Sequence, residues 1–113
     1  MAQAEARSCR LEAVGGGRFR ISGDLGFDAA VELLASGRRD FGREGRTEVD
    51  LSGVTDADSA GLAVLLEWIR MARQEGRQIG FSGMPRRLAD LARIGGVSEF
   101  LPIGTAQRME NGG

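Results

Sequence analysis

The chain has 113 residues, of which 42% are hydrophobic and 27% charged, as in an average globular protein of one domain. Its formal net charge is −1 and its basic residues are spread along the chain, which argues against binding of nucleic acid. It has no histidine and no lysine, and its only cysteine is Cys9, which excludes Schiff-base chemistry, a P-loop lysine and an internal disulfide.

The first elements expected are a hairpin and a helix. Residues 8–14 and 18–22 alternate apolar and polar side chains, and the three glycines between them supply a turn, which predicts two antiparallel strands. After a glycine-rich break, apolar residues recur at helical spacing and predict an amphipathic helix over residues 27–37. Its apolar face consists of Phe27, Ala30, Val31 and Leu34.

A third strand and a second helix follow. Residues 47–51 alternate again and predict a strand, whereas residues 52–59 are rich in helix-capping side chains and predict a loop. The second helix is expected over residues 60–75, with an apolar stripe about 100° wide, the width of a face buried against a sheet. The stripe consists of Leu62, Leu65, Leu66, Ile69 and Ala72.

The last elements expected are a strand, a helix and a short closing segment. Residues 78–82 predict the fourth strand, because a glycine separates this apolar run from the helix before it. Residues 84–94 predict a third helix, which has its proline near the first turn, where a helix tolerates it. A short element over residues 100–103 closes the order.

This order of elements, ββαβαβα, predicts the architecture. It contains two strand-helix-strand units, whose crossovers imply parallel strands, and the hairpin adds an antiparallel edge. We therefore expect an α/β fold with a small mixed sheet of four or five strands and three to four helices packed on it. The domain would span residues 8–104, between mobile tails at residues 1–7 and 105–113.

The sequence also favours a cytoplasmic protein without catalysis, cofactor or metal. The longest strongly apolar run, residues 61–66, is far shorter than the roughly 20 residues that span a bilayer, and no signal segment is visible at the N-terminus. Two aspartates, Asp56 and Asp58, precede a helix, where a capping role is more common than metal binding. No nucleophile and base pair can be assembled from the residue types present.

The loop before the second helix resembles the signature of STAS domains, the fold shared by sulfate transporter tails and anti-sigma factor antagonists. The family pattern is a strand with a central aspartate, a turn, and Asp-Ser/Thr-x-Gly-Leu at a helix start. Asp58, Ser59, Gly61 and Leu62 match it, and the resemblance extends from about residue 11 to residue 102. Anti-sigma factor antagonists carry a phosphorylated serine immediately before the glycine, where this chain has Ala60.

Within the family, the chain is most similar to the MlaB-type branch, small cytoplasmic subunits of a phospholipid transporter. The similarity lies in residues 58–66, 88–93 and 100–102. It implies a non-catalytic subunit that binds the ATPase of a lipid-transporting ABC complex, an MlaF-like partner, and that is peripheral to the inner membrane through that partner. The alternative is an anti-sigma factor antagonist of a partner-switching system, with Ser59 in place of the missing phosphate acceptor.

The resemblance also implies where a partner binds. It assigns the contact to the tip of the loop and the helix start, which comprise Asp58, Ser59, Ala60, Gly61 and Leu62. For the two acidic residues of this loop, a plain capping role is the alternative.

Two further groups of residues are candidates for the same interface. Val64, Trp68 and Met71 form a second apolar stripe on the second helix, which either packs against a neighbouring helix or forms an exposed docking ridge. Arg86 and Arg87 lie in the first turn of the third helix and are either solvated side chains or a charged rim that orients the partner.

Overall fold

A four-stranded mixed sheet forms one layer of the domain in the computed structural model, which describes residues 9–42 and 45–101. The strands are β1 (Cys9–Gly15), β2 (Arg18–Leu25), β3 (Arg46–Ala57) and β4 (Gln78–Ser82), and their order in the sheet is β1-β2-β3-β4. β1 pairs antiparallel with β2, whereas β2 with β3 and β3 with β4 are parallel. The predicted parallel pairing of residues 47–51 with residues 78–82 is therefore confirmed.

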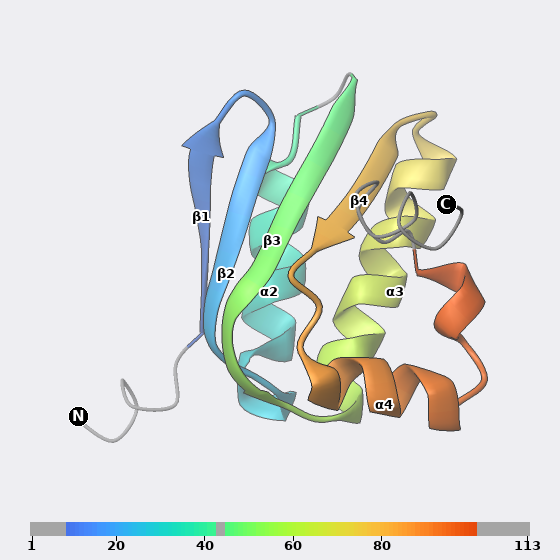
Figure 1. Cartoon of the computed structure of the whole chain (residues 1–113). Helices are drawn as coiled ribbons and strands as arrows, with labels where there is room; N and C mark the ends of the chain where they lie inside the picture. Colours follow the sequence, from blue (N-terminus) through green and yellow to red (C-terminus); the bar gives the residue numbers. More distant parts are fainter. Residues whose placement is uncertain (1–8, 43–44, 102–113) are drawn as a thin grey trace, which may run out of the picture.

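The helices are α2 (Phe27–Asp40), α3 (Ser59–Gln74) and α4 (Arg86–Ile94), followed by the short 3₁₀ helix η1 (Ser98–Phe100). Figure 1 shows α2 and α3 side by side behind the sheet and α4 running below β4. The crossovers from β2 to β3 and from β3 to β4 run in the same direction along the sheet. Because such connections are right-handed, α2 and α3 lie on the same face of the sheet. The α/β fold with a small mixed sheet is confirmed, and the two predicted tails lie outside the described residues.

The core lies between the sheet and this helix pair. Alternating residues of the strands, such as Ile21, Val49 and Phe81, are fully buried against the helices, because successive strand side chains point to opposite faces. An aromatic chain connects the layers: Phe41 makes edge contacts with Phe19 at 4.9 Å and with Trp68 at 5.0 Å between ring centroids.

Two strands are longer than the alternation of the sequence predicts. β2 continues to Leu25 and β3 continues to Ala57, through the segments that we expected to be a turn and a loop. The parallel register between them shifts twice, and these irregularities interrupt the alternation that marks a strand in the sequence. The extension brings the C-terminal ends of both strands to the edge of the sheet where α2 and α3 begin.

The buried face of α2 agrees with the prediction only in part, because Ala30 and Leu34 are partly buried against the core and the other two predicted residues are not. The helix buries Ala29, Leu33 and Gly37, while Phe27 is 76% exposed and Val31 is 81% exposed. The reason is the close contact of α2 with α3 at Gly37, where an added Cβ would lie 2.5 Å from Nε1 of Trp68. This contact turns the face that contains Gly37 inward and leaves two large apolar side chains on the outside.

Candidate partner-binding surface

Asp58 holds together the starts of two helices. Its Oδ1 accepts hydrogen bonds from the backbone N–H of Ala60 at 2.9 Å and of Gly61 at 3.1 Å, which makes it the N-cap of α3. Its Oδ2 accepts from the backbone N–H of Phe27, the first residue of α2, at 3.1 Å. One carboxylate therefore satisfies free N–H groups at both helix starts, and the predicted capping role of Asp58 is confirmed.

Gly61 sets how closely α3 approaches the sheet. An added Cβ at this position would collide with the carbonyl oxygen of Leu25 and come within 2.8 Å of its side chain. The backbone N–H of Asp58 also donates to the Leu25 carbonyl, at 3.3 Å. Gly61 of the family signature is thus required by the packing of the helix start on the end of β2, because no side chain fits between them.

The exposed part of this end forms what we call the tip surface, defined as Phe27, Val31, Ser59, Ala60 and Ala63. Ser59 and Ala63 are exposed and Ala60 is half-buried, whereas the two apolar residues of α2 are mostly exposed. The hydrogen bond from Phe27 to Asp58 fixes the start of α2 beside the start of α3. Exposed apolar side chains of α2 and the exposed hydroxyl of Ser59 therefore belong to two neighbouring helices whose starts are joined, an arrangement suited to binding a protein.

Five of the residues predicted to contact a partner are buried within the domain, so they are not part of its exposed surface. Gly61 lies against β2, and Leu62 is only 7% exposed. The proposed docking ridge is also in the core: Val64 and Trp68 are each 1% exposed and Met71 is 5% exposed. The alternative interpretation, packing against a neighbouring helix, is correct for Trp68, which contacts α2 at Gly37 and Phe41. The sequence pattern failed here because α3 is covered on two sides, by the sheet and by α2.

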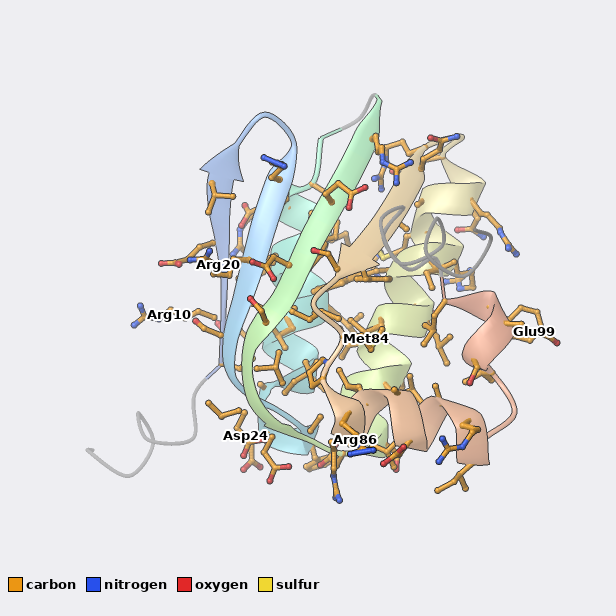
Figure 2. The ribbon with its side chains drawn as sticks, viewed as in Figure 1. Arg10, Arg20, Asp24, Met84, Arg86 and Glu99 are labelled. Atoms are coloured by element: carbon orange, nitrogen blue, oxygen red, sulfur yellow. The ribbon has the colours of Figure 1, made fainter. Side chains whose placement is uncertain are left out.

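The two arginines of the predicted rim differ from each other. Arg87 donates from Nε to the carbonyl oxygen of Ala57 at 2.9 Å and lies 3.7 Å from a carboxylate oxygen of Asp56, so it connects α4 to the end of β3. Arg86 is exposed, and Figure 2 shows it at the same end of the molecule as Asp24. Arg87 therefore has a structural role, and Arg86 is the arginine left for a rim.

The end of the domain that carries the tip surface is also acidic. An added Cβ at Gly26 would meet Oδ2 of Asp58 at 3.0 Å and Oδ1 of Asp24 at 3.3 Å, so these two carboxylates lie close together. Asp56 pairs in register with Asp24 across β2 and β3.

The described residues include no cluster of three or more potential metal ligands. Within the same residues, no helix has the length and apolar character of a membrane span.

The exposed apolar pair was missed at the level of sequence. Phe27 and Val31 were assigned to a buried helical face, because apolar residues at helical spacing usually face a core. The available signal was an alternative face at helical spacing, Ala29, Leu33 and Gly37, whose glycine lets the two helices approach closely.

Comparison with known proteins shows the family to which this chain belongs. A family described as "Mlab, STAS domain" matches residues 9–103. The intermembrane phospholipid transport system binding protein MlaB of Escherichia coli K12 is 32% identical over 79 residues, which cover 70% of this chain and 79% of that protein.

Two solved structures share the fold. The anti-sigma factor antagonist SpoIIAA of Bacillus, in its unphosphorylated form, is 14% identical with a TM-score of 0.63, and the match covers 91% of this chain and 93% of that one. The murine anion transporter Slc26a9 is 20% identical with a TM-score of 0.60, over 83% of this chain but only 16% of the transporter. At these identities the two structures establish the fold alone.

Proposed function

This chain belongs to the MlaB-type branch of the STAS domain family, and we propose that it is a non-catalytic subunit that binds and supports the ATPase of a phospholipid-transporting ABC complex. The observation that carries the proposal is the tip surface, where Asp58 joins the starts of two helices and where Ser59 on α3 and Phe27 and Val31 on α2 are exposed. The curated relative, a binding protein of an intermembrane phospholipid transport system, supplies the class of partner.

The chemistry of the surface supports binding more than catalysis. Phe27 provides a large apolar group in an exposed position, the type of residue that forms the centre of protein interfaces. Ser59 adds a hydroxyl that can donate and accept a hydrogen bond. The aspartates at this end favour a partner with a basic surface. This attraction would raise the rate and specificity of association more than the affinity.

We further propose that the protein acts in the cytoplasm, on the inner face of the membrane, because it reaches the membrane through the transporter. Its partner would be the ATPase subunit, an MlaF-like protein. No cofactor is part of the proposal, because binding through the tip surface requires none.

Co-purification with the ATPase subunit encoded by the same organism tests the proposal. Phe27→Asp and Ser59→Leu should each abolish co-purification, since one places a charge and the other places bulk in the interface. Ile94→Asp is the matched control: Ile94 is 79% exposed, as large an exposure as that of Phe27, but it lies on α4. Normal binding by the first two variants, or equal loss with the control, would show that the partner docks elsewhere.

The alternative function is a phosphorylation-controlled anti-sigma factor antagonist. One observation favours it: the Ser59 side chain is exposed at a helix start and accessible to a kinase. One observation opposes it, because Ala60 occupies the position before Gly61 at which the resemblance places the phosphorylated serine. We therefore prefer the transporter subunit.

A further inference from the structure

The free edge of β1 is the second surface of this domain suited to binding. β1 is the outermost strand of the sheet and pairs with β2 along one side only. It has seven residues, about 24 Å of strand, and the backbone groups of its outer side have no partner strand among the described residues. Figure 1 shows neither a helix nor another strand of the described chain beyond this edge. We propose that this edge pairs antiparallel with β1 of a second copy of the chain, because the charged and apolar side chains of β1 are complementary to themselves in that pairing.

The side chains of β1 alternate between the two faces of the sheet. Leu11 lies on the helix side, where it packs partly buried against the core, whereas Arg10 and Glu12 are exposed on the opposite face. Figure 2 shows Arg10 extending outward from β1, away from the rest of the sheet. Edge strands are commonly protected by like charges that repel another edge. Here the two exposed charges have opposite signs.

The position of these charges makes the edge complementary to itself. An antiparallel pairing of two copies with its two-fold axis at Leu11 places Arg10 of each copy opposite Glu12 of the other, twice over. Residues opposite each other in an antiparallel pair lie on the same face, so both ion pairs form on the open face and the two Leu11 side chains meet on the helix side. Two polar contacts and one apolar contact thus fit a single register.

Within the described part of one copy, Arg10 has no carboxylate partner, and Glu12 lies opposite an arginine that already contacts another carboxylate. Arg10 lies opposite Ser22 and has no ion pair among the described residues. Glu12 lies opposite Arg20, which itself lies 3.5 Å from a carboxylate oxygen of Asp50. A second copy would give Arg10 its carboxylate, and it would provide Glu12 with a cation that no other group shares.

The dimer would contain one continuous sheet of eight strands, four from each copy. Its two-fold axis is perpendicular to the sheet, so the helices of both copies lie on the same side and the two tip surfaces point to opposite ends. The pairing leaves both tip surfaces free and does not depend on the proposed function. The contact is smaller than a standard stable interface, so we expect association at micromolar or higher concentration.

Sedimentation velocity over a concentration series tests the pairing. The unmodified chain should dimerise, and Arg10→Glu should weaken the dimer by about tenfold or more, because two attractive pairs become two repulsive ones. The charge-swapped variant Arg10→Glu with Glu12→Arg restores complementarity and should recover most of the affinity. Thermal unfolding of each variant checks that the fold is retained, since Glu12→Arg also faces Arg20 within its own copy.

Disulfide crosslinking tests the register directly. In a Cys9→Ser background, Leu11→Cys should give an efficient disulfide-linked dimer on oxidation, because the two thiols face each other across the axis. Val14→Cys is the matched control: Val14 is 53% exposed, but its two copies would lie about 20 Å apart in this register. A chain that stays monomeric at all concentrations, a dimer indifferent to Arg10→Glu, or equal crosslinking at both positions would each overturn the inference.

Discussion

The backbone N–H of Phe27 and the carboxylate of Asp58 lie 3.1 Å apart, although 31 positions separate the two residues in the chain. The bond exists because β2 and β3 are parallel neighbours that both continue to the same edge of the sheet. The helix that follows each strand therefore begins beside the other. The loop of the family signature thus organises two helices at once, and the exposed face of both depends on it.

Substitution of Asp58 should reveal this double role. Asp58→Ala removes the caps of both helix starts and should lower the free energy of unfolding by about 1–4 kcal/mol, twice the usual cost of a single lost cap. Asp58→Asn keeps one acceptor oxygen and should cost less than Asp58→Ala. Urea unfolding of both variants measures the difference. Equal losses would mean that one retained acceptor oxygen does not preserve the stabilisation, so that both oxygens or the negative charge are needed.

The glycine of the signature is expected to be the most sensitive position of this loop. Gly61→Ala places a methyl group against the carbonyl oxygen of Leu25 and forces the start of α3 away from β2. The expected loss is about 2–4 kcal/mol, in the range of severe packing faults. Ala63→Gly, at an exposed position of the same helix, should cost only about 1 kcal/mol and serves as the control in thermal or urea unfolding. A Gly61→Ala variant as stable as the control would contradict the close contact.

Local features of this fold were predictable from the sequence. Alternation located the first three strands, and an apolar run set off by a glycine located the fourth. The capping role of Asp58 followed from its residue type just before a helix. The crossover rule then predicted the parallel pairing of β3 with β4. Each of these inferences uses neighbouring residues or a general rule of chain connection.

The contacts between α2 and α3 were not predictable in the same way. Apolar residues at helical spacing indicate that a helix has a buried face, but Phe27 and Val31 satisfy that spacing as well as Ala29 and Leu33 do. The choice depends on the fit between Gly37 and Trp68, residues on different helices. The sequence alone therefore could not predict that Phe27 and Val31 are exposed, because their exposure depends on how α2 packs against α3.

Cys9 should react slowly with alkylating reagents. Burial, with a smaller contribution from the negative charge of Asp24, raises the pKa of its thiol from 9.0 to about 11. Since only the thiolate reacts, alkylation by iodoacetamide near pH 8 should be about a hundredfold slower than for an unperturbed thiol and should rise toward pH 11. Asp24→Asn should move the profile to lower pH. A profile centred near pH 9 in the folded protein would contradict the burial.

The same pKa shift predicts a loss of stability at high pH. The folded state keeps the thiol proton at pH values where the unfolded state has released it. The stabilisation is therefore complete below about pH 9 and is lost as the pH rises toward 11. Comparison with Cys9→Ala by urea unfolding at both ends of this range isolates the contribution of the thiol.

Phosphorylation separates the two candidate functions. Incubation with an anti-sigma factor kinase and ATP should leave the mass of the protein unchanged, because Ala60 has no hydroxyl group. Intact-mass spectrometry measures the result, and Ala60→Ser is the matched variant that restores the acceptor of the family pattern. Stoichiometric phosphate on Ser59 of the unmodified chain would instead favour the partner-switching regulator.

The final prediction contrasts an exposed aromatic residue with a buried one. Phe27 is 76% exposed and Trp68 is 1% exposed, and they lie on different helices. Phe27→Ala removes surface that only a partner would cover, so stability should change by less than about 0.5 kcal/mol while binding of the ATPase falls. Trp68→Ala opens a cavity between α2 and α3 and should cost about 3–5 kcal/mol of stability.

Binding titrations at a temperature where both variants are folded, together with urea unfolding, measure the two effects. If Trp68→Ala binds normally once it is folded and Phe27→Ala does not, the interface lies on the exposed face of α2 and not on the apolar stripe of α3. The opposite result, with weak binding by a folded Trp68→Ala and normal binding by Phe27→Ala, would require α3 to separate from α2 when the partner binds. In that case the tip surface defined by Phe27 and Ser59 would not be the docking site.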